Sequence, residues 1–243
     1  MKINTDGLIL KRGVVGESDR LVTLLTRDLG VIRAFVHGGS KVKGKTASAT
    51  DMLCYSSFTV TQSKDTYSIS EVTPIEVFFD LRGDIERLSL AQYFCEVAGA
   101  LVVEGEPAEE PLRLTLNALY LLMKGLRPAA QIKAVYELRM MTLSGFMPDL
   151  TACDACGKDP EGAAFFFCRE GVVRCESCGG EGGILVSAGV LDAMRHIVSA
   201  PLERLFSFEM PPESLAALAA VCERYLLTQV DRRFTALAFY HSL

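Results

Sequence analysis

Residues 153–157 read Cys-Asp-Ala-Cys-Gly, and residues 175–179 read Cys-Glu-Ser-Cys-Gly. Each Cys-x-x-Cys pair places two thiols at the tip of a tight turn, and the glycine after each pair lets the backbone turn with positive φ. Four thiolates in a tetrahedron form the preferred structural site of Zn²⁺, with no open position for a catalytic water. The spacing therefore predicts one structural zinc ion, held by Cys153, Cys156, Cys175 and Cys178.

Two other uses of these cysteines compete with a metal site. A thioredoxin-like redox pair accounts for only one Cys-x-x-Cys, whereas the chain has two. A disulfide framework is disfavoured because residues 1–6 lack the apolar segment of a secretory signal, which predicts a cytoplasmic location with reduced thiols. We expect ordinary thiols at the other four cysteines: Cys54, Cys95, Cys168 and Cys222.

The region before the cysteine pairs divides into two parts by its hydrophobic pattern. Short apolar or alternating runs separated by turn residues predict strands at 5–11, 21–26, 31–36, 53–62 and 67–71. Five short strands within about 70 residues favour a small closed barrel. From Asp80 onward the apolar residues recur at helical spacing, which predicts helices near 81–102, 111–123 and 129–144.

The cysteine pairs interrupt this helical part. Residues 163–168 and 172–173 are expected to form a hairpin with Glu170 and Gly171 at its turn, and Ser187 is a good N-cap for a helix to about Ser199. A last helix should begin near Pro211. The predicted architecture is α+β: a five-stranded barrel over 1–80, then a helical domain over 81–243 with a zinc ribbon inserted at about 150–182.

Charge is distributed unevenly along the 243 residues. The net charge is −5, yet residues 1–50 hold nine Lys or Arg and only four Asp or Glu. A basic end on an acidic chain is typical of a surface that contacts a polyanion, although solvated surface charge gives the same count. No apolar run approaches the roughly 20 residues needed to span a membrane.

Catalytic patterns are absent from the sequence. It has three histidines, His37, His196 and His241, and lacks a nucleophile elbow and a dinucleotide fingerprint. We therefore interpret the chain as a binding protein and not an enzyme.

Several segments together resemble the RecO family of bacterial recombination mediators. The amino-terminal likeness lies in Thr5–Lys11, the Gly16–Thr26 run with Gly-Glu-Ser-Asp-Arg, and the Gly38–Lys45 loop. The later likeness lies in 88–94, 136–139, 145–150 and the four cysteines. The resemblance implies an amino-terminal OB-fold, binding of single- and double-stranded DNA, strand annealing, and work with RecR and the single-strand-binding protein SSB to load RecA. It also implies association with the nucleoid.

An OB barrel presents a groove that follows a phosphate backbone, with aromatic residues on which bases stack. Given the resemblance, we expect the DNA-binding residues to be Lys11, Arg12, Arg20, Arg33, His37, Lys41, Lys43 and Lys45. Phe35, Tyr55 and Tyr67 are candidates for stacking, whereas Phe58 should point inward. Ser40 and Val42 replace Arg or Pro of many relatives, which argues against bidentate arginine contacts from the loop.

SSB carries an acidic and apolar carboxy-terminal tail, as the resemblance implies. We expect this tail to dock on the helical domain, with Lys133 or Arg139 on its carboxylate. The alternative is that Arg139 pairs with a buried carboxylate such as Glu96. For the whole protein, two other functions remain open: an RNA-binding or translation-associated OB and zinc-ribbon protein, and a thiol redox protein using Cys153 and Cys156.

Overall fold

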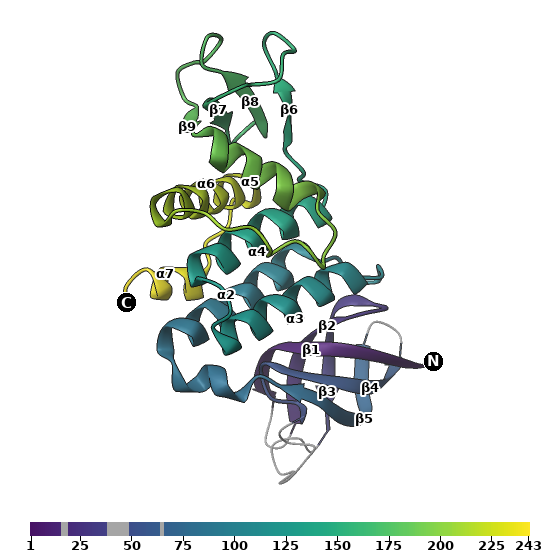
Figure 1. Ribbon diagram of the computed structural model, residues 1–243. Helices are drawn as coiled ribbons and strands as arrows, with labels where there is room; N and C mark the ends of the chain where they lie inside the picture. The colour runs from purple at the N-terminus through teal and green to yellow at the C-terminus, as the bar shows by residue number, and fades with distance from the viewer. Residues whose placement is uncertain (16–18, 38–48, 64–65) are drawn as a thin grey trace. The chain divides into compact units, whose positions relative to one another are not determined.

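The computed structural model describes residues 1–15, 19–37, 49–63 and 66–243 (Figure 1). The chain forms two compact units, one made of residues 1–124 and 234–243 and the other of residues 125–233. The sequence pattern placed the division at residue 80 instead. The difference arises because the helices that follow residue 80 pack on the barrel strands and share their unit.

The first unit is built on a five-stranded barrel. Its strands occur where the alternating sequence predicts them, although β1 and β5 are longer than expected. They are β1 (Lys2–Val15), β2 (Asp19–Thr26), β3 (Gly30–Val36), β4 (Cys54–Ser63) and β5 (Thr66–Val77). Antiparallel pairs join β1 to β2 and β4, β2 to β3, and β4 to β5, and a short parallel pair between β3 and β5 closes the ring.

The barrel encloses a core of alternating inward residues. Phe58 is buried in this core, as predicted, and so is Tyr67, which was expected to be a surface aromatic. Leu8, Ile9 and Leu10 are all buried because β1 has the barrel interior on one side and a helix on the other. Leu10 packs against Gly99 of that helix. The sequence pattern at β1 is therefore a continuous apolar run rather than an alternation.

Among the described residues, four helical segments complete the first unit. They are the 3-10 helix η1 (Phe79–Gly83), α2 (Ile85–Leu101), α3 (Glu109–Lys124) and α7 (Thr235–Tyr240). The Asp84 side chain caps α2 by accepting hydrogen bonds from the amides of Glu86 and Arg87 at 3.0 and 3.1 Å. The sequence did not predict α7. It packs on α2, where Phe234 meets Tyr93 edge to face at 5.5 Å.

The β2–β3 turn is held tightly against the loop between α2 and α3. The amide of Gly105 donates to the carbonyl of Leu29 at 2.9 Å, and the amide of Ala108 donates to that of Arg27 at 2.8 Å. Gly30 has a φ of 63°, and a Cβ atom there would lie 1.9 Å from the carbonyl oxygen of Val103. This position excludes every side chain.

Replacement of Gly30 by alanine should lower the free energy of unfolding by about 2–4 kcal/mol, since the left-handed backbone and the collision add. Urea denaturation followed by circular dichroism measures this. Gly83→Ala is the control, because a Cβ atom at Gly83 would have no neighbour within 4 Å. Equal urea midpoints for the Gly30 and Gly83 variants would contradict the conclusion that position 30 excludes a side chain.

The second unit combines three helices with a small sheet. The helices are α4 (Ala129–Leu143), α5 (Ala188–Ser199) and α6 (Pro212–Val230). The sheet has the strand order β6-β8-β7-β9, formed by β6 (Asp149–Cys153), β7 (Ala164–Phe167), β8 (Val172–Cys175) and β9 (Ile184–Val186). The β7–β8 hairpin and the Ser187 N-cap are present as predicted. Within the described residues, we find no helix with the length and apolarity required to cross a membrane.

Candidate metal centre and nucleic-acid interface

The two cysteine pairs leave the sheet at the same edge. Strands β6 and β8 are parallel neighbours, with Cys153 opposite Val173, so their carboxyl ends lie side by side. Cys153 ends β6 and Cys175 ends β8. Each is followed by a tight turn, closed by Gly157 N–H to Cys153 O at 2.8 Å and by Cys178 N–H to Cys175 O at 3.0 Å. The sheet topology thus brings together residues that lie about twenty positions apart.

The glycines after the two pairs serve different purposes. Gly157 has a φ of 72°, as the turn was predicted to require. Gly179 does not take a positive φ, which corrects the prediction for the second turn. A side chain is excluded there by space instead, since a Cβ atom would lie 2.4 Å from the Phe165 ring.

The four sulfur atoms form a compact cluster that could hold a metal ion. All lie within 4.8 Å of one another, and the sulfurs of Cys156 and Cys175 are 3.8 Å apart. A tetrahedron with Zn–S bonds of about 2.3 Å has sulfur–sulfur edges of about 3.8 Å. The donor set and its spacing therefore fit a tetrathiolate ion, and Cys168 lies outside the cluster, as predicted.

The electrostatics of the cluster favour a bound cation. Backbone amides, first that of Cys175, lower the pKa of Cys153 to about 6, so one thiolate forms readily. The neighbouring thiols of Cys175 and Cys156 raise the pKa of Cys178 to about 12. Four thiolates cannot coexist in this space without a positive charge among them, and a divalent ion supplies it.

A row of polar side chains crosses the outer face of the barrel. Lys11 on β1 is the register partner of Thr23 on β2, and Thr23 is the partner of Arg33 on β3. Partners across a sheet point to the same face, so the two cations flank Thr23 on the outside of the barrel. Both cationic side chains are exposed.

Next to this row lies an aromatic pair. Phe35 and His37 follow Arg33 at two-residue spacing, so they share its face of β3. Their rings stack with centroids 6.2 Å apart and planes 8° apart. The Nδ1 atom of His37 lies 3.0 Å from a carboxylate oxygen of Asp19, which orients the ring. Two cations beside a half-exposed aromatic stack can contact phosphates and bases.

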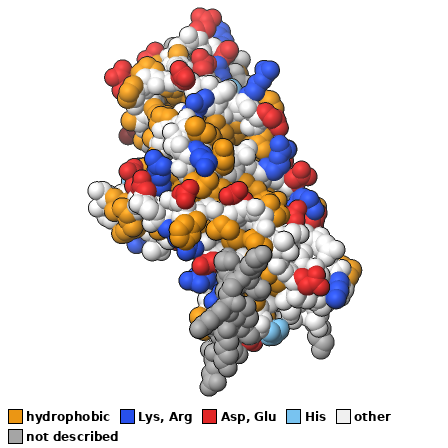
Figure 2. Space-filling model, turned by 60° about the horizontal axis from the view of Figure 1, so that its bottom comes forward, with side chains coloured by type: hydrophobic (Ala, Val, Ile, Leu, Met, Phe, Trp, Pro, Cys, Tyr) orange, Lys and Arg blue, Asp and Glu red, His pale blue; other side chains and the backbone are white. Residues whose placement is uncertain are grey.

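On the face of the molecule in Figure 2, basic and acidic side chains are interspersed and do not form one broad positive field. This mixture agrees with the acidic balance of residues 51–243 in the sequence. We call the group formed by Lys11, Arg33, Phe35 and His37 the barrel outer face.

Comparisons with known proteins identify the family of this chain. A family model described as Recombination protein O N terminal matches residues 1–78, and one described as Recombination protein O C terminal matches residues 82–238. This chain belongs to the RecO family. A relative named DNA repair protein RecO, from Acetivibrio thermocellus, is 32% identical over 99% of this chain and 97% of the relative. Proteins with the same name from Caldicellulosiruptor bescii and Symbiobacterium thermophilum are 30% and 28% identical and cover 98% and 99% of the chain.

The other predicted DNA-binding residues of this RecO-family chain are ion-paired, half-buried or outside the described residues. Arg12 is half exposed and pairs with Asp51 at 3.0 Å, and Asp51 also pairs with Arg82 at 3.3 Å. Arg20 is half-buried near the start of β2. Lys41, Lys43 and Lys45 lie outside the described residues. Of the predicted stacking aromatics, Phe35 and Tyr55 are half-exposed, whereas Tyr67 is 7% exposed and packs in the barrel core.

The proposed tail-docking residues on α4 require correction. The Lys133 side chain is only 4% exposed, and its Nζ atom lies 2.8 Å from Glu137 Oε1 and 2.6 Å from Glu223 Oε2. It is thus buried between two carboxylates and cannot meet a peptide at the surface. Arg139 donates to the carbonyls of Val198 and Ile197 at 2.7 and 3.3 Å, so it caps the end of α5 and does not pair with Glu96. Glu96 instead accepts a hydrogen bond from the amide of Ala236 at 3.1 Å.

Proposed function

We propose that this protein acts in DNA repair as a recombination mediator. In this proposal the barrel is an OB-fold that binds single- and double-stranded DNA, and the protein anneals complementary strands. Together with RecR it helps to load RecA onto DNA coated with SSB, and it catalyses no reaction itself. Membership of a family whose relatives are named for DNA repair supports the role.

The single observation that supports DNA binding most directly is the barrel outer face. Lys11 and Arg33 present two cations across three strands, and Phe35 and His37 add a stacked pair beside them. Few aromatics with several cations favour binding that depends on salt and little on sequence. Such binding suits annealing, because neither strand needs to be distinguished from the other.

We also propose that the sheet of β6 to β9 is a zinc ribbon and that the ion is structural. All four positions of a tetrahedral ion would be filled by Cys153, Cys156, Cys175 and Cys178, and bound zinc would supply a cross-link among these turns. The SSB tail remains a proposed partner without an assigned site, since Lys133 is buried. A cytoplasmic, nucleoid-associated location follows from the proposed role.

Reversal of the charges on the barrel outer face tests this function. Lys11→Glu with Arg33→Glu should weaken binding to single- and double-stranded oligonucleotides alike, by about tenfold or more, and reduce the salt slope by about 1 per lost phosphate contact. Fluorescence anisotropy across a salt series measures both. The control is Lys124→Glu with Lys158→Glu, which makes the same charge change at exposed positions outside the barrel outer face and should affect binding less.

Annealing assays extend the test to the mediator role. The wild-type protein should anneal complementary strands coated with SSB, and RecR should alter the rate. Equal affinity for RNA and DNA without any annealing would favour an RNA-binding protein instead. Unchanged DNA affinity in the Lys11 and Arg33 double variant would show that the interface lies elsewhere.

A further inference from the structure

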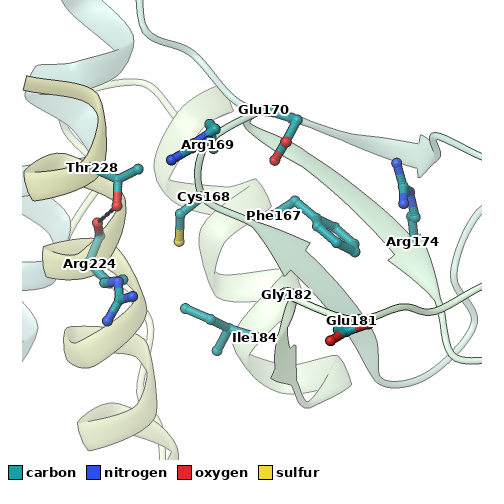
Figure 3. Close-up of a pocket in the computed structure, with 10 residues that line it drawn as sticks. All are labelled: Phe167, Cys168, Arg169, Glu170, Arg174, Glu181, Gly182, Ile184, Arg224 and Thr228. Atoms are coloured by element: carbon teal, nitrogen blue, oxygen red, sulfur yellow. Dashed lines mark hydrogen bonds between the residues drawn. The ribbon is translucent and has the colours of Figure 1, made fainter.

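A second cationic site lies in the unit that carries the cysteine cluster. A pocket of about 490 Å³ opens between the β7–β8 hairpin, the segment leading to β9, and helix α6 (Figure 3). This volume is in the range of sites that hold one small molecule or one nucleotide. The lining residues are Phe167, Cys168, Arg169, Glu170, Arg174, Glu181, Gly182, Ile184, Arg224 and Thr228.

The pocket is held together by contacts of α6 with the hairpin turn. The side-chain amide of Gln229 donates to the carbonyl of Cys168 at 2.8 Å and to that of Arg169 at 3.0 Å. Tyr225, one helical turn before Gln229, packs edge to face on Phe166 with ring centroids 5.3 Å apart. These contacts fix Arg224 on α6 beside Arg169 on the turn, so the pocket exists before any ligand binds.

Two of its arginines are available to an anion. Arg169 and Arg224 are both exposed, and within the described parts of the chain neither has a carboxylate within the 4 Å of an ion pair. Figure 3 shows both guanidinium groups on the α6 side of the pocket, with Cys168 between them. Burial raises the pKa of Cys168 to about 11, so this thiol is neutral and offers no negative charge to compete.

The opposite side of the pocket offers a flat surface. The Arg174 guanidinium lies over the Phe167 ring at 4.4 Å, and its Nη2 atom pairs with Asp154 at 2.9 Å. One face of the guanidinium plane thus rests on the aromatic ring, while its side chain is still 33% exposed. Such a plane is a platform on which a nucleobase stacks.

We propose that this pocket binds one nucleotide of a single-stranded nucleic acid. Its phosphate lies between Arg169 and Arg224, and its base stacks on Arg174. Glu170 and Glu181, which also line the pocket, can accept hydrogen bonds from base amino groups. Their charge repels any anion, so it is these amino groups and the stacking surface of Arg174 that favour a nucleotide over an acidic peptide.

The inference rests on the proposed function and deepens it. Annealing requires that one protein hold two strands, or two parts of one strand, at the same time. The barrel outer face belongs to the first unit and the pocket to the second, so the chain has two separate sites for single strands. Loss of the pocket should therefore slow annealing more than it weakens capture of one strand.

Charge reversal in the pocket tests this directly. Arg169→Glu with Arg224→Glu should slow annealing about tenfold, because two charge-assisted contacts to phosphate are lost. Affinity for one short oligothymidylate should stay within about twofold, since the barrel outer face is intact. Arg232→Glu with Arg233→Glu is the matched control, because these arginines are exposed, carry the same charge and lie outside the pocket.

Photo-crosslinking identifies the contact itself. Single-stranded DNA containing 5-iodocytosine, which carries an amino group, should crosslink to the peptide that carries Phe167 and Arg174, and the double variant should lose this adduct while keeping adducts on the barrel. An unchanged adduct and an unchanged annealing rate would overturn the inference. The inference also fails if the variant loses binding of an acidic probe peptide but keeps its DNA adduct. Wild-type protein that binds no DNA at all would instead refute the proposed function.

A neutral variant shows whether the glutamate variant anneals slowly only because it fails to fold. Arg169→Gln with Arg224→Gln keeps polar, uncharged side chains at two exposed positions, so its circular dichroism and melting temperature should match those of the wild type. It should show a smaller annealing defect than the glutamate variant, in the same direction. A neutral variant that folds normally and anneals at the wild-type rate counts against the pocket.

Discussion

Removal of zinc from the purified protein should unfold the β6–β9 sheet and destabilise the second unit. The strands of this sheet are only three to five residues long, too short to be stable by pairing alone. Structural zinc sites contribute an apparent binding free energy of about 10–16 kcal/mol, which is as large as the whole stability of a typical domain, about 5–15 kcal/mol. We expect one zinc per chain by metal analysis, and a large fall in melting temperature after chelation.

Single substitutions separate the metal ligands from the other thiols. Cys175→Ser should reproduce much of the effect of chelation, because it removes one of the four sulfurs. Cys168→Ser is the matched control, since Cys168 is also half-buried and follows β7 directly but lies outside the cluster. DNA affinity per folded molecule should change little in either variant. Protein that is purified without metal and melts at the same temperature would contradict a structural zinc.

The barrel strands and the two cysteine turns could be predicted from the sequence because both depend on short-range patterns. Alternating residues such as Phe58 and Val60 define an inner face within a single strand, and both are buried in the barrel core. Each cysteine pair likewise specifies its own turn, and Gly157 takes the positive φ that the first of these turns needs. Local geometry is sufficient for features of this kind.

Features formed by distant segments could not be predicted in the same way. Tyr67 alternates like a surface aromatic, but closure of the barrel through the β3–β5 pair encloses it. The pocket combines Arg169 and Arg174 with Arg224, about fifty residues later, and no spacing rule connects them. Helix α7 is only six residues long and is stabilised by contact with α2, which is far earlier in the chain.

Lys133 illustrates the same difficulty for a charged residue. A lysine in a helix is ordinarily a surface group, so the sequence favoured a role at the rim of a peptide site. Helix α4 is instead buried on most sides, with Ile132, Ala134, Val135, Tyr136 and Leu138 all inaccessible. Glu137 is one turn away on the same helix, but Glu223 comes from α6 and only the fold brings it to Lys133.

Replacement of Lys133 by methionine should therefore destabilise the second unit strongly. Burial by itself lowers the pKa of this lysine, but the two carboxylates outweigh burial and raise the pKa above its ordinary value. The ammonium is thus fully charged and compensates Glu137, whose side chain is 0% exposed, and Glu223, whose side chain is 21% exposed. Removing one member of a buried ion pair costs about 3–5 kcal/mol, because a charge is left without compensation. Chemical denaturation monitored by circular dichroism measures the loss.

A second substitution distinguishes this electrostatic cost from lost packing. Lys133→Met with Glu137→Met removes both charges and keeps unbranched side chains of similar length, so it should recover most of the stability lost in the single variant. Glu223→Gln should have the mildest effect, since it leaves the Lys133–Glu137 pair intact and its own side chain reaches water. If the double variant is no more stable than Lys133→Met, the lysine acts through packing and not through charge.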